Sequence, residues 1–277
     1  MPAELKLSPS PTVTAGGRVD GHPGAPLTAV SRWEGADYDR EVFLIASGAD
    51  RVCASLYSAP NPTHGVVILP GWARDGRYLL EWSHRLALGV AKRGGCGVLI
   101  QWPGNEDSEG DVDAVTLDRL VEVATDAVAA GRLRHPGARW SFAGLRLGGA
   151  VAALAAGRAR ACSIAMVQPD LDPVAYFDHA SRSERLNLLR GDPHPGWAFG
   201  TPMPAGLRQP DAAALVQQAL GSLTCPAAVI RHAAPKLAPL PDSVAEIVVP
   251  GNWYFPPGGD HRPLRRQALK YLTQQAR

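Results

Sequence analysis

Residues 140–156 restrict the fold of this chain more than any other stretch. They begin as a short apolar run, pass through Gly144-Leu-Arg-Leu-Gly148, and continue as a series of small apolar residues. The first run predicts a buried strand and the last predicts a helix, and the two glycines let the strand and the helix cross without a Cβ atom between them. A turn of this kind lifts one side chain above a parallel sheet. The raised residue is Arg146.

Arg146 carries a guanidinium group, which stays protonated at any working pH and cannot act as a nucleophile. We therefore expect a tight turn without a nucleophile at its apex, and two roles stay open for the side chain. It can hold an anion beside the positive end of the following helix, with the backbone N–H groups of Leu147 and Trp72 nearby. Alternatively, it can pair with a carboxylate such as Asp75 or Asp170, because a buried arginine without a partner is too costly.

The remainder of the chain alternates apolar strands with helical patterns, which predicts an α/β fold with a mostly parallel sheet. Two β-type runs within residues 41–57 predict an antiparallel hairpin at its start. Residues 1–38 are rich in Pro, Gly and Ser and predict a flexible arm, and residues 39–277 predict one domain. Prolines interrupt the segment of about 170–222, which we expect to form a helical lid over a site. Further strands are expected within 65–72, 97–104, 162–169, 226–232 and 244–250, and helices at about 78–92, 116–130 and 262–275.

Composition excludes several classes of function. With 277 residues, 45% of them hydrophobic, the chain can bury one large core. A net charge of +2 and the lack of a basic run with interleaved aromatics predict no nucleic-acid partner. We find no signal peptide and no apolar stretch long enough to cross a bilayer, so we expect a cytoplasmic protein without a membrane partner. The four cysteines lack a CxxC pair and predict buried free thiols, and we expect no metal and no cofactor.

Polar and aromatic residues follow the predicted strands, although the strands themselves are apolar. Ligands of open α/β sheets bind at the carboxyl ends of the strands, so this row predicts a substrate pocket. The simpler alternative is that solvent begins where the strands end. The residues expected in the pocket are Trp72, Asp75, Gln101, Trp102, Leu147, Gln168, Asp170, His232, Trp253 and Tyr254.

The order of these parts resembles the α/β-hydrolase superfamily over roughly residues 40–277. Gly144-Leu-Arg-Leu-Gly148 is similar to the serine-less turn of the exosortase A system-associated hydrolases. The resemblance implies an α/β-hydrolase fold with a degenerate catalytic triad and an acyl-type substrate. The other features that carry it are the hairpin start, Leu69-Pro-Gly-Trp72, Asn105-Glu-Asp-Ser-Glu-Gly110, Met166-Val-Gln-Pro169 and the arginines at 182 and 185.

The resemblance also implies which part of a Ser-His-acid arrangement is left. The superfamily places its histidine before the last helix, where this chain has His261, which is a general base or an unused remnant. The superfamily's acid follows the strand that here ends at His232, but the next carboxylate in the sequence is Asp242. His232 itself fits a polar strand end better than a catalyst. Arg146 and His261 are therefore the candidate catalytic residues.

Three functions stay open at this stage. They include both enzymes and a binding protein, so the sequence does not decide whether the chain is an enzyme. The first is a non-covalent step, such as proton transfer, isomerisation or hydration, on a carboxylated or acylated small molecule. The second is an inactive hydrolase-like binding protein, and the third is ester or thioester hydrolysis with displaced machinery. Ser108, Ser141 and Cys162 lack the strained presentation that activates a nucleophile. The sequence is also compatible with a homodimer.

Overall fold

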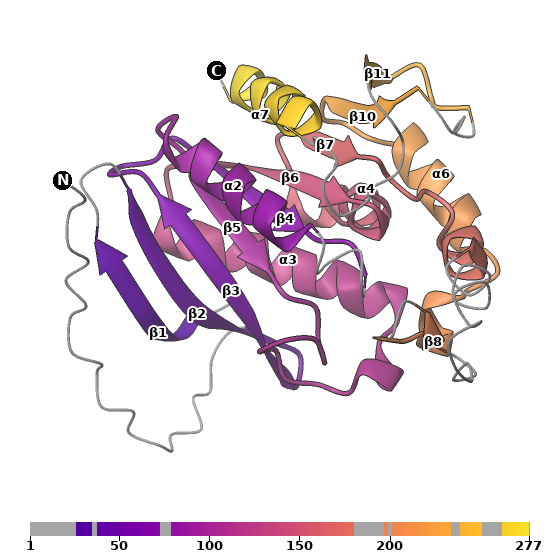
Figure 1. Cartoon of the computed structure of the whole chain (residues 1–277), viewed down its shortest axis with the longest axis horizontal. Coiled ribbons are helices and arrows are strands. Elements are labelled where there is room, and N and C mark those ends of the chain that lie inside the picture. Colours follow the sequence, from indigo (N-terminus) through magenta and orange to yellow (C-terminus); the bar gives the residue numbers. More distant parts are fainter. Residues whose placement is uncertain are drawn as a thin grey trace.

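The protein is built around a nine-stranded sheet, as a computed structural model shows (Figure 1). The structure describes residues 26–34, 38–72, 79–179, 197–198, 201–233, 239–250 and 262–276. The strand order is β1-β2-β3-β5-β4-β6-β7-β10-β11. β1, β2, β3 and β5 pair antiparallel, whereas all the other neighbours pair parallel, so the expected hairpin and mostly parallel sheet are confirmed. The strands of this sheet are β1 (Pro26–Glu34), β2 (Asp39–Ser47), β3 (Asp50–Ser58), β4 (His64–Leu69), β5 (Cys96–Ile100), β6 (Arg139–Leu145), β7 (Ile164–Val167), β10 (Ala227–His232) and β11 (Val244–Val249). A separate two-stranded sheet is formed by β8 (Trp197–Ala198) and β9 (Thr201–Pro202).

Strand β1 corrects one expectation about the N-terminal segment. Residues 1–38 were expected to form a flexible arm, but Pro26–Glu34 pairs with β2 from Ile45 to Asp39. Residues 1–25 and 35–37 lie outside the described residues. The segment lacks the alternating pattern of a strand and joins the sheet at its edge, where only one side has to pair.

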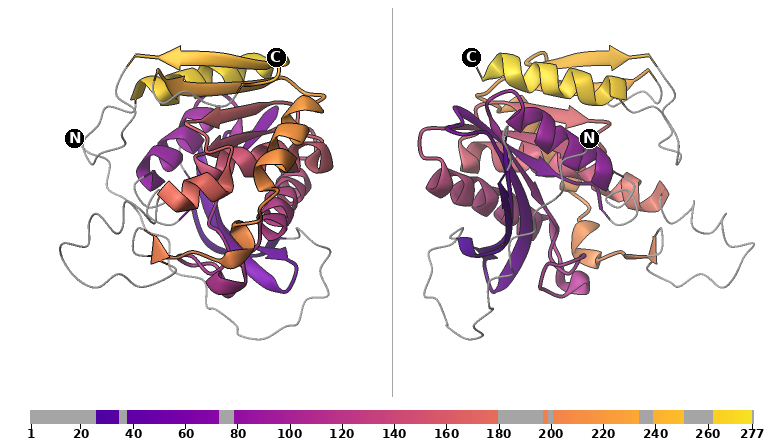
Figure 2. Two further views of the ribbon diagram at one scale, coloured as in Figure 1. Left: turned by 90° about the vertical axis from the view of Figure 1, so that its right-hand side faces the viewer. Right: turned by 60° about the vertical axis from the view of Figure 1, so that its left-hand side comes forward.

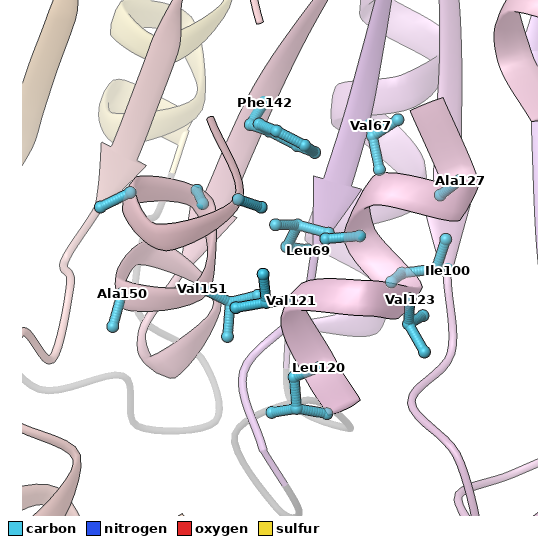
Figure 3. Packing of buried hydrophobic residues seen from close by; sticks show 14 of the residues in the cluster. Val67, Leu69, Ile100, Leu120, Val121, Val123, Ala127, Phe142, Ala150 and Val151 are labelled. Atoms are coloured by element: carbon cyan, nitrogen blue, oxygen red, sulfur yellow. The ribbon is translucent and has the colours of Figure 1, made fainter. Parts of the chain in front are cut away.

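Helices cover both faces of the sheet, and each layer has its own core (Figure 2). One face carries α2 (Leu80–Ala91) and α7 (Arg262–Gln275), and α7 lies along β10 and β11 in both views of Figure 2. The opposite face carries α3 (Leu117–Arg134), α4 (Leu147–Ala159) and α6 (Ala212–Gly221), with short 3-10 turns η1 (Val112–Ala114) and η2 (Ala205–Leu207). Figure 3 shows the packing on this face, where Val121 of α3 and Val151 of α4 meet Leu69 of β4.

Helix α6 limits the expected lid. The lid was expected to extend from about 170 to 222, but α6 packs against α4 and buries Ala212, Val216 and Leu220 in the core. It is therefore a crossover helix between β7 and β10. Residues 180–196 and 199–200 of the expected lid lie outside the described residues.

At the turn between β6 and α4, the strand and the helix approach each other as closely as Gly144 and Gly148 predicted. A Cβ atom on Gly144 would lie 2.2 Å from the carbonyl oxygen of Gly148, and one on Gly148 would lie 2.2 Å from the carbonyl oxygen of Leu69. Both contacts involve backbone atoms, which cannot rotate away. Only glycine fits these two positions, so the crossing of β6, α4 and β4 depends on them.

In the parts of the chain that the structure describes, no helix is both long and apolar enough to span a membrane.

We expect alanine at either glycine to destabilise the fold. Gly144→Ala and Gly148→Ala should each lower the free energy of unfolding by roughly 3 kcal/mol or more, because backbone has to move apart. Gly157→Ala is the matched control, since Gly157 also lies in α4 but nothing lies within 4 Å of a Cβ there. That control should be neutral or stabilise by up to about 1 kcal/mol. Urea unfolding curves measure all three, and equal stabilities for Gly148→Ala and Gly157→Ala would contradict the crossing.

Stability should also fall when the solution is made mildly acidic. Burial lowers the pKa of His64, His84 and His135, and a neighbouring arginine lowers each further. A histidine that stays neutral in the folded state but protonates in the unfolded chain stabilises the fold above its unfolded pKa of about 6.5. This stability is lost as the pH falls below that value, by at most about 1.4 kcal/mol per pH unit for each histidine. Unfolding free energies between about pH 7.5 and 5 should show the slope, and His64→Gln should flatten it.

Candidate functional site

Arg146 occupies the apex of the turn in a strained backbone conformation. Its φ is 54° and its ψ is −123°, at the start of α4. These angles match the first central residue of a type II′ turn, a position that favours glycine. For another residue such a conformation costs about 1–3 kcal/mol and persists only where the surroundings impose it. The strand, turn and helix that the sequence predicted here are all present.

Backbone hydrogen bonds impose this conformation from the next strand. The N–H of Arg146 donates to the carbonyl of Val167 at 3.2 Å. The carbonyl of Arg146 accepts from the N–H of Gly149 at 2.9 Å and from the N–H of Asp170 at 3.2 Å. The end of β7 and the residues after it therefore hold the turn from one side, and α4 holds it from the other.

The guanidinium of Arg146 pairs with a carboxylate. Its Nε lies 3.1 Å from Oδ2 of Asp170, and its Nη1 donates to the carbonyl of Gln168 at 3.2 Å. The side chains of Arg146 and Asp170 are only 10% and 18% exposed. Of the two roles left open by the sequence, this geometry favours the ion pair over an anion clamp, because Nε and Nη1 are already engaged by Asp170 and by the carbonyl of Gln168. Asp170 is one of the two carboxylates that the sequence offered, and Asp75 lies outside the described residues.

Gln168 links this ion pair to the strand on its other side. It is 3% exposed and has a positive φ of 46°. Its Oε1 accepts from the backbone N–H of His232 at 3.3 Å, while Nδ1 of the equally buried His232 lies 3.0 Å from the carbonyl of Val249. The Nε2 of Gln168 is buried and finds no hydrogen-bond acceptor among the described residues. The carboxyl ends of β6, β7, β10 and β11 thus bring together Arg146, Gln168, Asp170 and His232.

Two of the three tryptophans expected in the pocket, Trp72 and Trp102, are packed in the core. Trp72 and Trp102 are 1% and 2% exposed, and Nε1 of Trp102 donates to the carbonyl of Pro70 at 3.1 Å. Sequence reasoning missed Tyr176, whose hydroxyl donates to the carbonyl of Trp72 at 3.3 Å. Tyr176 lies in a helix of residues 173–179 that Asp172 caps by accepting from the N–H of Ala175 at 2.9 Å. An aspartate followed by proline was the signal for that helix.

The remaining predicted site residues fall into two groups, those that the structure describes and those that lie outside the described residues. Leu147 is fully buried at the start of α4, while Gln101 turns to the acidic loop, where its Oε1 accepts from the N–H of Asp107 at 2.8 Å. In the described ranges no three His, Cys, Asp or Glu side chains gather closely enough to hold a metal ion. The second group lies outside the described residues and comprises Asp75, Trp253, Tyr254 and His261.

Comparison with known proteins identifies the fold. No family model and no curated protein matches the sequence. Among solved structures, ferulic-acid-bound Est1E from Butyrivibrio proteoclasticus is 16% identical with a TM-score of 0.61, over 84% of this chain and 98% of that chain. A predicted CIB-like hydrolase from Thermoplasma acidophilum is 11% identical with a TM-score of 0.57, over 86% and 99%. The thioesterase domain from the curacin biosynthetic pathway is 13% identical with a TM-score of 0.55, over 86% and 99%. The chain has an α/β-hydrolase fold.

A double-mutant cycle should reveal the coupling of Arg146 and Asp170. Asp170→Asn should lower the free energy of unfolding by about 3 kcal/mol, because it leaves a largely buried guanidinium without a counter-charge. Arg146→Met removes that charge, so Asp170→Asn should cost about 1–3 kcal/mol less in its presence. Asp178→Asn is a matched control, since its carboxylate pairs with Arg208 in an exposed ion pair worth at most about 1 kcal/mol. Additive effects of the two substitutions in chemical denaturation would contradict the coupling.

Proposed function

Starting from an α/β-hydrolase fold, we propose that this protein is a hydrolase-like binding protein without a nucleophile at its turn. It binds an acylated small molecule at the carboxyl end of the sheet and forms no covalent intermediate there. The observation that carries the proposal is the Arg146–Asp170 pair, with Nε and Oδ2 at 3.1 Å. A hydrolase needs a serine, cysteine or aspartate at this apex, and a guanidinium cannot replace it.

The ion pair also weighs against catalysis by Arg146 itself. An arginine stabilises a developing negative charge only when its donors are free to reach that charge. Here Asp170 already neutralises the guanidinium, and a carboxylate entering the site would meet the negative charge of Asp170 as well. Proton transfer would therefore rest on His261, which lies outside the described residues. Binding is the function that the described geometry supports best, and an acylated ligand suits the neutralised pair better than a free anion.

The two serines among the alternative nucleophiles are engaged in the framework of the fold. Oγ of Ser108 accepts from the N–H of Cys53 at 2.9 Å and donates to the carbonyl of Gln101 at 3.1 Å. Oγ of Ser141 lies 2.8 Å from Oγ of Ser163, and both residues are buried. A nucleophile needs a base within hydrogen-bonding distance and room for a substrate. The hydrogen bonds of Ser108 and Ser141 serve structure, which supports a protein without displaced hydrolytic machinery.

An acyl ligand agrees with the unpartnered donor beside the pair. Nε2 of Gln168 is buried without an acceptor in the described residues, and an acyl carbonyl oxygen is a neutral acceptor for such a donor. Among the structural neighbours, Est1E is seen with ferulic acid bound, and another is a thioesterase domain. We therefore place the ligand's acyl group toward Gln168.

Reactivity tests this proposal directly. The purified protein should not label with a fluorophosphonate and should not hydrolyse a nitrophenyl acyl ester above the background rate. Arg146→Ser restores a serine at the apex, yet it should gain little activity, because no carboxylate follows β10 in the sequence before Asp242. Mass spectrometry of intact labelled protein and initial rates measure both outcomes.

A stoichiometric adduct on a serine of the wild-type protein would overturn the proposal. Thermal unfolding with a panel of acyl esters, acyl thioesters and the corresponding free acids supplies the binding half of the test. A ligand at 100 times its Kd should add about 2.7 kcal/mol to the free energy of unfolding. A panel without any stabilising compound would leave the binding function unsupported even if the protein is unreactive.

A further inference from the structure

Two cysteines lie together at the amino-terminal ends of β7 and β10, far along the strands from Arg146. All four cysteines are free thiols, as expected, but only Cys53 and Cys96 are buried. Cys162 and Cys225 are partly exposed, which the sequence did not predict. They are the two thiols that a reagent in solution can reach.

The strand register brings these two residues side by side. Ile164 of β7 pairs with Ala227 of β10, and the N–H of Ile164 donates to the carbonyl of Pro226 at 3.0 Å. Cys162 precedes Ile164 by two residues, and Cys225 precedes Ala227 by two residues. Neighbouring strands lie about 4.8 Å apart, which falls within the Cα–Cα separation of about 4.4–6.8 Å found in disulfides.

The surroundings of the pair agree with this proximity. Cys162 and Cys225 both lie in bends just before their strands, next to the hydrogen bond between Ile164 and Pro226. Burial raises the pKa of the Cys225 thiol, and a thiolate at Cys162 would raise it further. A raised pKa leaves less thiolate on Cys225, so we assign the attack on the peroxide to Cys162.

We propose that Cys162 and Cys225 form a dithiol site that a peroxide oxidises to an intramolecular disulfide. The thiolate of Cys162 attacks one peroxide oxygen, the O–O bond breaks, and hydroxide leaves, so that Cys162 becomes a sulfenic acid. The sulfur of Cys225 then attacks the sulfur of Cys162, an S–S bond forms, and the sulfenic oxygen leaves as water. Two thiols and one hydrogen peroxide give one disulfide and two waters, with the peroxide as the oxidant.

The disulfide would close a loop around the segment that presents the candidate site. Residues 163–224 include Gln168, Asp170 and α6. Closing a loop of roughly 60 residues restricts the unfolded chain strongly, so oxidation should raise the melting temperature by several °C. The inference does not depend on the proposed binding function, because the thiols lie at the opposite ends of the strands from Arg146.

Peptide mapping of the full chain tests the proposal. The reduced protein is treated with hydrogen peroxide, the remaining thiols are alkylated with iodoacetamide, and trypsin then releases residues 161–182 and 209–231 as separate peptides. We expect these two peptides to be joined with the loss of two hydrogen atoms, and to separate again on reduction. The melting temperature should rise with the same peroxide dose and return on reduction.

Three variants distinguish this site from general oxidation. Cys162→Ser and Cys225→Ser should each abolish the joined peptides, and Cys225→Ser should leave a sulfenic acid on Cys162 that reacts with dimedone. Cys53→Ser is the control and should leave the joined peptides unchanged, since Cys53 is buried. The proposal would be overturned if both thiols were recovered as alkylated cysteine after peroxide treatment. Disulfides between molecules in place of the intramolecular one would also overturn it. Esterase assays do not enter this test, so its outcome is independent of the proposed function.

Discussion

The close crossing at Gly144 and Gly148 is the constraint on which the rest of this structure depends. The strand β6, the helix α4 and the end of β4 meet where a Cβ atom would lie 2.2 Å from a backbone oxygen. Because α4 can approach the sheet this closely, its small side chains are almost completely buried against the sheet and against the neighbouring α3 (Figure 3). The same crossing compels a sharp turn between them. Arg146 takes its position and its strained φ from that turn.

The residue at the apex decides what such a turn can do. The fold keeps an energetically costly backbone conformation at Arg146, with hydrogen bonds from Gly149 and Asp170 to its carbonyl group. In a hydrolase that strain presents a nucleophile, but here it presents a guanidinium that Asp170 neutralises. Most of the geometry of a reactive site is therefore present around a group that cannot attack an acyl carbon. This contrast is why binding fits the described residues better than acyl transfer.

The segment between β7 and β10 connects the two ends of the sheet. At the carboxyl ends of the strands it supplies Gln168 and Asp170, which contact Arg146, and its α6 packs on α4. At the amino-terminal ends it is bounded by Cys162 and Cys225. A covalent link between those thiols would restrict the same segment that holds the ion pair. The redox chemistry proposed at one end of the sheet and the ligand binding proposed at the other thus involve the same piece of chain.

Local patterns determined the hairpin, the order of strands and helices, and the turn around Arg146, since apolar runs and glycine positions act over a few residues. The identity of the apex residue likewise excluded a nucleophile there. Contacts between distant segments decided the rest. Pairing at an open edge made a strand of Pro26–Glu34, and packing on α4 placed α6 in the core. The sequence offered Asp75 and Asp170 as partners of Arg146. The position of the chain after β7 brings Asp170 to the guanidinium, and residue spacing does not encode that distance.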